Sequence, residues 1–191
     1  MKCFFFVTLF TFHFSLSLAQ WQSLGNVDSF SSNKNQITVK SGKSILNIRV
    51  LAPDLMRVRL APNGMFPPDM SWAVVKTDWE ASDVRVTDSP DEINVSTSEI
   101  SLVIRKKPLR LKFLDKTGNV INEDEPSKGM SSSGSEVRVW KTMPLGERYY
   151  GFGEKAGSLE RSQTHMTMWN SDIPAYAPDT DPLYQTHPFR P

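Results

Sequence analysis

Residues 109–121, LRLKFLDKTGNVI, decide the fold of this chain. Residues 109–113 alternate apolar and basic side chains, as a half-buried β-strand does. Residues 115–119, DKTGN, contain the Asp, Gly and Asn that are typical of a tight turn, and residues 120–121 begin a return strand. The stretch therefore predicts an antiparallel β-hairpin.

Short strands of the same kind recur on both sides of this hairpin. We expect them at residues 37–39, 44–51, 56–60, 72–77, 84–87, 93–95, 100–105 and 137–141. Pro, Gly, Asn and Asp occupy the connections, and no window of helical length has a period of 3.6 residues. This pattern predicts an all-β, antiparallel sandwich rather than a βαβ fold.

Three polar segments interrupt the strand pattern or run beside it. Residues 21–35 are rich in Ser and Asn, and we expect a lead-in whose aromatic side chains pack on a sheet edge. Residues 122–134 are acidic and then rich in Ser and Gly, which predicts a flexible loop. Residues 105–112 are rich in Lys and Arg, but because the charges alternate with apolar side chains we favour a solvated strand face over a binding patch.

The N-terminal residues 1–19 predict a cleaved secretory signal rather than a part of the fold. Lys2 supplies a positive end, residues 4–18 are strongly apolar, and residues 17–19 form a small-x-small cleavage site before Gln20. The alternative, a membrane anchor, requires a longer apolar run. We therefore expect a secreted protein, extracellular or periplasmic, with no membrane partner and with residues 20–191 as its β-sandwich domain.

The charge and cysteine content exclude several classes of function. Removal of residues 1–19 takes away one of the 22 basic residues and none of the 21 acidic ones, so the formal net charge becomes zero. Without a basic excess, nucleic acid is not an expected partner. The single cysteine, Cys3, leaves with the signal, so we expect no disulfide, no thiolate metal site and no cysteine nucleophile. Neither a metal nor any other cofactor is expected.

The C-terminal part of the chain has a different composition, beginning with residues 149–154, YYGFGE. Glycines two residues apart between aromatic residues allow close backbone approach or a sharp turn. A phosphate-binding loop is disfavoured, because no helix-forming run and no Lys-Ser/Thr pair follow. We expect a β-bulge packed under aromatic rings.

Residues 168–172, MWNSD, are the candidate binding residues. The ring of Trp169 offers an apolar face to a sugar, and the side chains of Asn170 and Asp172 offer hydrogen bonds to its hydroxyl groups. The alternative is an Asx-type turn beside a packed Trp. Asp179 and Asp181 lie next to prolines and are expected to form turns.

No catalytic constellation is evident in the sequence. A retaining glycosidase needs two carboxyl groups roughly 5 Å apart, whereas the acidic residues here are scattered over predicted turns. For His165 and His187, a surface or packing role is favoured over catalysis. No metal-ligand spacing is present.

The C-terminal motifs, taken together, resemble a known family. Residues 149–189 carry YGFGE, WNSD and DPLY…PF in that order, and they resemble the end of the N-terminal β-domain of glycoside hydrolase family thirty-one, which contains α-glucosidases and α-xylosidases. A looser match extends back through residues 55–59, 71–75 and 107–111, so the resemblance covers most of the mature chain. It implies a galactose-mutarotase-like β-sandwich placed before a (β/α)8 barrel.

The resemblance also implies roles for individual residues. In this family an Asp on a loop over the barrel mouth helps to bind sugar, and the matching residue is Asp172, with Trp169 and Asn170 as neighbours. The glycines and Glu154 of YGFGE match a framework motif. Residues 148–191 are therefore expected to form the loop that faces the barrel.

For a full-length parent, the resemblance implies retaining hydrolysis of terminal α-linked glucose, or xylose, from oligosaccharides, through a covalent glycosyl intermediate and without a metal. The expected partners are the oligosaccharide and the protein's own C-terminal barrel. The catalytic aspartates of the family lie on that barrel, and residues 190–191 stand where its first apolar strand is expected. We therefore expect a fragment with no catalytic residue and no activity by itself.

Two alternatives remain open. A free-standing carbohydrate-binding β-sandwich would use Asp172 and Trp169 without turnover. A mutarotase-like epimerase is less favoured, because that reaction needs a paired imidazole and carboxylate at a sugar ring.

Overall fold

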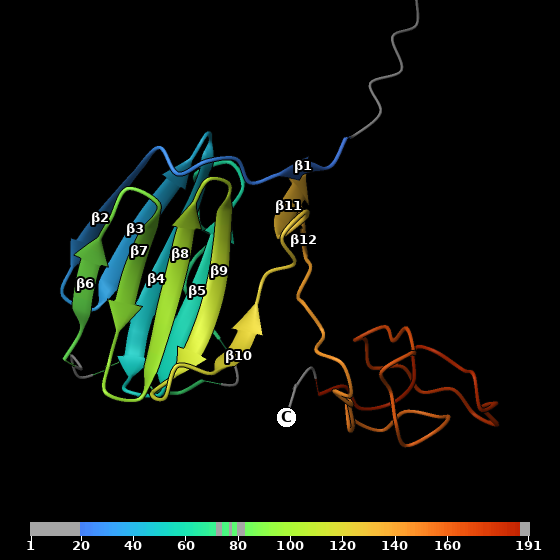
Figure 1. Ribbon diagram of the computed structural model, residues 1–191. Coiled ribbons are helices and arrows are strands. Elements are labelled where there is room, and N and C mark those ends of the chain that lie inside the picture. Colours follow the sequence, from blue (N-terminus) through green and yellow to red (C-terminus); the bar gives the residue numbers. More distant parts are fainter. Residues whose placement is uncertain (1–19, 72–73, 77, 80–82, 188–191) are drawn as a thin grey trace, which may run out of the picture. The chain divides into compact units, whose positions relative to one another are not determined.

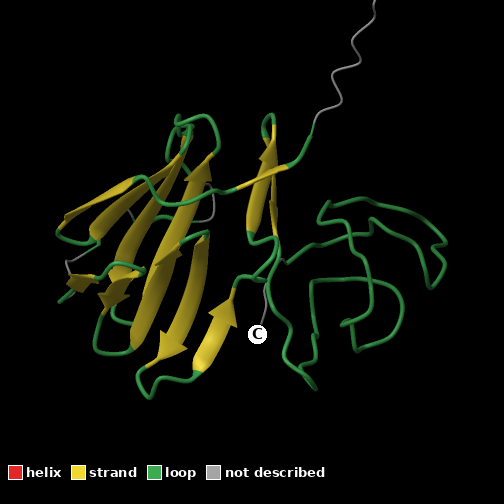
Figure 2. Ribbon diagram, turned by 45° about the horizontal axis from the view of Figure 1, so that its top comes forward, coloured by secondary structure: helices red, strands yellow, loops and turns green. Residues whose placement is uncertain are grey.

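The structure, a computed structural model, describes residues 20–71, 74–76, 78–79 and 83–187. Contacts divide the chain into two units, Met1–Thr142 (unit 1) and Met143–Pro191 (unit 2). All the described strands belong to unit 1, and the described residues of unit 2 form neither strand nor helix (Figure 2). The predicted signal, residues 1–19, lies outside the described residues.

Unit 1 contains two larger antiparallel sheets and one small one (Figure 1). The first sheet has the order β2 (Ser29–Asn33), β3 (Gln36–Ser41), β4 (Ser44–Ala52) and β5 (Leu55–Ala61). The second sheet has the order β10 (Val120–Glu123), β9 (Leu109–Asp115), β8 (Ile100–Lys106), β7 (Glu92–Ser96) and β6 (Arg85–Asp88). The third sheet contains β1 (Gln22–Ser23), β11 (Met130–Ser133) and β12 (Glu136–Val139). The predicted all-β, antiparallel class is confirmed.

The core of unit 1 lies between the two larger sheets. Most of its fully buried members come from the inward positions of both sheets: Ile37, Val39, Leu46, Ile48, Val50, Ile93, Val95, Leu102 and Ile104. Each of these residues alternates with a partly exposed neighbour, which is the period of two that a sheet with one buried face requires. Because burial of one such side chain contributes about 1.5–3 kcal/mol, this alternation selects the register of β3, β4, β7 and β8, the strands that carry these residues.

Two predictions about polar segments are wrong. Residues 21–35 contain β1 and β2 rather than an irregular lead-in, although Phe30 packs against the core from the edge strand β2, as expected for its aromatic side chains. Residues 122–134 contain β11 rather than a flexible loop. Strand β2 lies at a sheet edge, where polar side chains face solvent. In β11 the buried Ser131 shares a hydrogen bond of 3.0 Å with Ser23 of β1. Paired hydroxyl groups thus replace the apolar alternation that sequence analysis detects.

The sequence also predicted a strand at residues 72–77, and the described part of this range does not form one. Residues 72, 73 and 77 lie outside the described residues, and residues 74–76 are not in a strand. Among the described residues, no helix is long and apolar enough to cross a bilayer.

The prediction of a solvated face for residues 105–112 is wrong for Arg110, which is 7% exposed. Its guanidinium donates hydrogen bonds to the carbonyl oxygens of Pro126 at 3.0 Å and Ser127 at 3.1 Å. A Cβ on Gly129 would lie 2.7 Å from Cδ of Arg110, so only glycine leaves room for the guanidinium. Arg110 therefore organises the turn that leads into β11.

Candidate functional site

The C-terminal motifs lie in unit 2, where hydrogen bonds between three segments replace regular secondary structure (Figure 2). Residues 181–187, from the DPLY motif, contact both residues 152–155, from YGFGE, and residues 167–173, around WNSD. We call residues 181–187 the clamp segment. It is the element that brings the three sequence motifs together.

The first contact of the clamp segment is with the glycine motif. Gly153 and Thr186 form an isolated antiparallel bridge, and the Glu154 amide donates to the Gln185 carbonyl at 3.0 Å. A Cβ on Gly153 would lie 2.3 Å from that carbonyl oxygen. The predicted close backbone approach is confirmed, whereas the predicted bulge is wrong, because Gly153 lies in no strand.

The second contact holds the WNSD motif at several points. The Tyr184 amide donates to the Ser171 carbonyl at 2.7 Å, and the Tyr184 hydroxyl donates to the Ile173 carbonyl at 3.1 Å. The Thr186 hydroxyl donates to Oδ1 of Asn170. The backbone on both sides of Asp172 is therefore fixed by one neighbouring segment.

Two charged side chains complete this framework. The Asp181 carboxylate accepts a hydrogen bond from the Thr167 amide at 2.6 Å, and the pKa of Asp181 is lowered, first by the Thr167 side chain and further by this amide. Nζ of Lys155 donates to the carbonyls of Thr167 at 3.2 Å and Leu183 at 3.0 Å, so it ties together all three segments. Asp181, which was expected only to form a turn, also anchors the start of the WNSD region.

The three candidate residues differ in whether their side chains are exposed and free of hydrogen bonds, and so in whether they can contact a ligand. Trp169 is 70% exposed, and Asp172 is exposed and makes no hydrogen bond or ion pair with the described residues. Asn170 is exposed, but its Oδ1 is occupied by Thr186. An exposed indole and a free carboxylate three residues apart, on a backbone fixed at Ser171 and Ile173, have the chemistry to receive the apolar face and a hydroxyl group of a sugar. The alternative with a packed Trp does not describe this segment.

Tyr184 is the residue that sequence reasoning missed. Burial raises the pKa of its phenol, and the negative charge of Asp172 raises it further. Its ring meets that of Tyr176 edge-on, with 5.7 Å between centroids. The Tyr184 hydroxyl donates to the Ile173 carbonyl and so holds the backbone next to Asp172. Its place in the DPLY motif was the only signal in the sequence.

The remaining sequence candidates do not form a reactive group. His165 and His187 are both exposed, as the surface assignment predicts. Within the described residues, no cluster of three or more His, Cys, Asp or Glu side chains has the arrangement to hold a metal ion.

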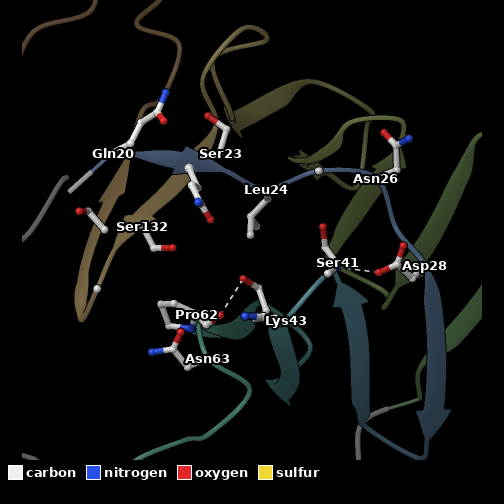
Figure 3. A pocket seen from close by; sticks show the side chains of 16 residues that line it. Gln20, Ser23, Leu24, Asn26, Asp28, Ser41, Lys43, Pro62, Asn63 and Ser132 are labelled. Atoms are coloured by element: carbon white, nitrogen blue, oxygen red, sulfur yellow. Dashed lines mark hydrogen bonds between the residues drawn. The ribbon is translucent and has the colours of Figure 1, made fainter. Parts of the chain in front are cut away.

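Unit 1 contains a polar pocket of 530 Å³ beside the N-terminal strand (Figure 3). Asn26, Lys43 and Asn63 are among the residues that line it, and no aromatic residue does. Asp28 already accepts a hydrogen bond of 2.6 Å from the Gly42 amide. Because the pocket lacks an aromatic ring in its lining and its carboxylate is engaged, it is a weaker candidate for sugar binding than Trp169 and Asp172.

The chain is similar to known glycosidases. A family model described as "Glycosyl hydrolase 31 N-terminal galactose mutarotase-like domain" matches residues 45–190. Alpha-glucosidase 2 of Bacillus thermoamyloliquefaciens is 34% identical over 168 residues, which cover 87% of this chain and 21% of that protein. An alpha-glucosidase of Saccharolobus solfataricus is 42% identical over 56 residues, which are 29% of this chain and 8% of that protein.

A solved structure extends this similarity to the fold. The GH31 dextranase of Flavobacterium johnsoniae, complexed with isomaltotriose, matches with a TM-score of 0.80 and 28% identity, covering 88% of this chain and 21% of that enzyme. The chain thus spans about one fifth of the length of the relatives that match most of it. With the family match over residues 45–190, this chain belongs to the galactose-mutarotase-like N-terminal domains of glycosyl hydrolase 31 enzymes.

Proposed function

We propose that this chain is the N-terminal domain of a secreted, retaining α-glycosidase that removes terminal α-linked glucose, or xylose, from oligosaccharides. In this proposal the domain is not catalytic. It presents Asp172 to the substrate, with Trp169 and Asn170 beside it, while a C-terminal barrel supplies the catalytic carboxylates. Its partners are the oligosaccharide and that barrel, without nucleic acid or membrane.

The observation that carries the proposal is the clamped WNSD segment. Tyr184 and Thr186 hold the backbone and the amide side chain around Asp172, yet the Asp172 carboxylate itself is exposed and bonded to no described residue. Fixed backbone with a free carboxylate is what a preorganised binding residue needs. The names of the relatives, alpha-glucosidases and a dextranase complexed with isomaltotriose, support an α-linked glucose substrate.

Exposed apolar side chains of unit 2 support docking to a further domain. Leu145 is fully exposed and Leu159 is 77% exposed, in addition to Trp169. Large apolar side chains with this exposure would become buried if unit 2 packed against a further domain. The reading frame beyond codon 191 tests this part: continuation into a barrel with two catalytic aspartates is expected, and a true stop codon would contradict it.

The role of Asp172 is tested by replacing it with alanine in the full-length enzyme. Loss of one charge-assisted hydrogen bond to a sugar hydroxyl, worth about 1.5–3 kcal/mol, should lower kcat/KM on an α-glucoside by roughly 10- to 100-fold. The melting temperature should not change, because Asp172 makes no hydrogen bond or ion pair with the described residues.

Asp179→Ala is the matched control, since Asp179 is also an exposed aspartate of unit 2. Its kinetics should equal those of the parent. An Asp172→Ala enzyme with unchanged kcat/KM, or with a lowered melting temperature, would show that Asp172 is not a substrate-binding residue.

The exposed Trp169 also fits a second function, a free-standing carbohydrate-binding domain. This candidate predicts that isomaltotriose quenches the tryptophan fluorescence of the 191-residue chain and that the reading frame stops after codon 191, whereas the first proposal expects a reading frame that continues into a barrel. Secretion is tested separately: mass spectrometry of the exported protein should find a mature chain that begins at Gln20.

A further inference from the structure

Three arginines meet on the outer face of the first sheet of unit 1. Arg57 and Arg59 occupy alternate positions of β5, and Arg49 of β4 is the direct cross-strand partner of Arg57. Side chains at such positions have Cβ atoms about 4.5–5.5 Å apart. The three guanidinium groups therefore share one small area of the sheet.

This arrangement is electrostatically unbalanced. Like charges directly opposite each other destabilise a sheet, and among the described residues Asp69 is the carboxylate that pairs with these cations. Asp69 accepts two hydrogen bonds from Arg57, at 3.0 and 2.5 Å, and lies 3.5 Å from NH1 of Arg59. Arg49 makes no hydrogen bond or ion pair with the described residues. The described residues that line the area therefore carry an excess of two positive charges.

A pocket of 340 Å³ opens over these residues. Its volume falls within the roughly 300–1,000 Å³ of small-molecule sites. Besides the arginines and Asp69, its lining consists of Gln36, Thr38, Ile45, Asn47 and Phe66. Their amide and hydroxyl groups can exchange hydrogen bonds with a polyhydroxylated ligand.

The aromatic member of the lining is already oriented by an arginine. The guanidinium of Arg59 lies over the ring of Phe66, 5.0 Å from its centroid, and donates to the Pro67 carbonyl at 3.1 Å. Arg59 therefore holds the loop after β5 at the rim of the pocket. Arg49 makes neither an aromatic contact nor a carbonyl contact of this kind, so its guanidinium is available to bind an external anion.

We propose that this pocket binds a sugar that carries a carboxylate, such as a uronic acid residue, with the carboxylate on Arg49 and Arg57 and the hydroxyl groups on Gln36 and Asn47. A guanidinium is planar and pairs with a carboxylate through two parallel hydrogen bonds. The site uses no residue of unit 2. The choice of a sugar as the carrier of the carboxylate rests on the proposed function, whereas the requirement for an anion rests on the arginines alone.

Asp69 acts in this site as an internal competitor. Its two hydrogen bonds to Arg57 show the geometry that the ligand carboxylate would adopt. Because Asp69 is exposed, an external carboxylate can displace it or bind beside it to Arg49. Removing the Asp69 charge should therefore strengthen the binding of an anion.

The test is isothermal titration of the full chain with glucuronate, glucose and acetate in low salt. Glucuronate should bind at least tenfold more tightly than either of the other two probes. Arg49→Gln should weaken glucuronate binding at least fivefold, and Asp69→Asn should strengthen it at least threefold. Added sodium chloride should weaken it, because the contacts are exposed ion pairs.

Arg85→Gln is the matched control, since Arg85 is an exposed arginine on β6 of the other sheet. It should leave glucuronate binding unchanged, and circular dichroism should show that all variants are folded. Glucose binding as tight as glucuronate binding would overturn the role of charge. Acetate binding as tight would overturn the sugar, and equal losses in Arg49→Gln and Arg85→Gln would overturn the location.

The proposed function fails independently of this site. Asp172→Ala should leave glucuronate binding unchanged, because Asp172 is not part of the pocket. Absence of heat with every probe would overturn the anion site and leave the proposal for Asp172 as it stands.

Discussion

At the scale of single residues, Gly153 has the strictest requirement in unit 2. Its φ is +97°, and an added Cβ would meet backbone atoms of Gln185 at 2.3 and 2.9 Å, which have no flexible end to move aside. Gly153→Ala should therefore separate the YGFGE motif from the clamp segment. Limited proteolysis should cut the variant within residues 143–187 at least tenfold faster than the parent chain.

Gly151→Ala distinguishes the steric clash with Gln185 from the backbone strain of an alanine at positive φ. Gly151 has a similar φ of +84°, but nothing lies within 4 Å of its added Cβ. This variant should suffer only the backbone cost of a positive φ, about 1–2 kcal/mol. Equal proteolysis rates for the two variants would mean that the contact with Gln185 does not hold the clamp segment.

Asp172 and Tyr184 show which residues of the candidate site can be predicted from residue type and which cannot. Trp169, Asn170 and Asp172 were predicted because their side chains have the chemistry of sugar binding. Tyr184 and Lys155 act by bonding to backbone carbonyls 11 to 28 residues away in sequence. Such contacts depend on how a loop closes and have no periodic pattern, so the residue types alone did not identify them.

At the scale of elements, the β9–β10 hairpin depends on one carboxylate. Asp115 accepts hydrogen bonds from the amide and hydroxyl of Thr117 and from the amide and side chain of Asn119, at 2.7–3.0 Å. The hydrogen bonds from Thr117 and then Asn119 lower the pKa of Asp115 to about 2, from the ordinary 3.8. The ionised carboxylate therefore stabilises the folded turn above pH 3.8.

Asp115→Asn should consequently melt at a lower temperature than the parent at pH 7. Because the folded pKa is depressed, the advantage of the parent is complete above pH 3.8 and disappears as the pH falls to about 2. Melting curves of both proteins at several pH values measure this difference. Asp54→Asn is the control, since Asp54 is exposed in the β4–β5 turn and accepts no hydrogen bond from the described residues. A parent advantage that is constant from pH 7 to pH 2 would contradict the role of the Asp115 charge.

Elements with apolar alternation were predictable, and polar elements were not. The predicted strands at 44–51, 56–60 and 109–113 lie within β4, β5 and β9, because burial of every second side chain fixes both their type and their register. β2 and β11 were missed because their side chains are mainly serines. Arg110 was misjudged for a related reason: alternation marks it as outward, yet the turn at 124–129 covers it.

At the scale of the whole molecule, the two units differ in the interactions that stabilise their folded structure. In unit 1, two sheets enclose a continuous apolar core. In unit 2, Leu183 is the one fully buried apolar side chain among the described residues, and single hydrogen bonds between loops hold the backbone. Local opening of unit 2 therefore exposes little apolar surface and breaks few contacts.

This difference predicts unequal protection of backbone amides from hydrogen exchange. Amides of β8, a strand paired on both sides, should exchange only through global unfolding of unit 1. The amides of Glu154 and Tyr184, bonded to Gln185 and Ser171, should exchange at least 100-fold faster after correction for intrinsic rates. Exchange followed by NMR measures both sets in one sample. Equal protection in β8 and in the clamp segment would contradict this prediction, because it would mean that the two units unfold together and that the loop contacts of unit 2 are as stable as the core of unit 1.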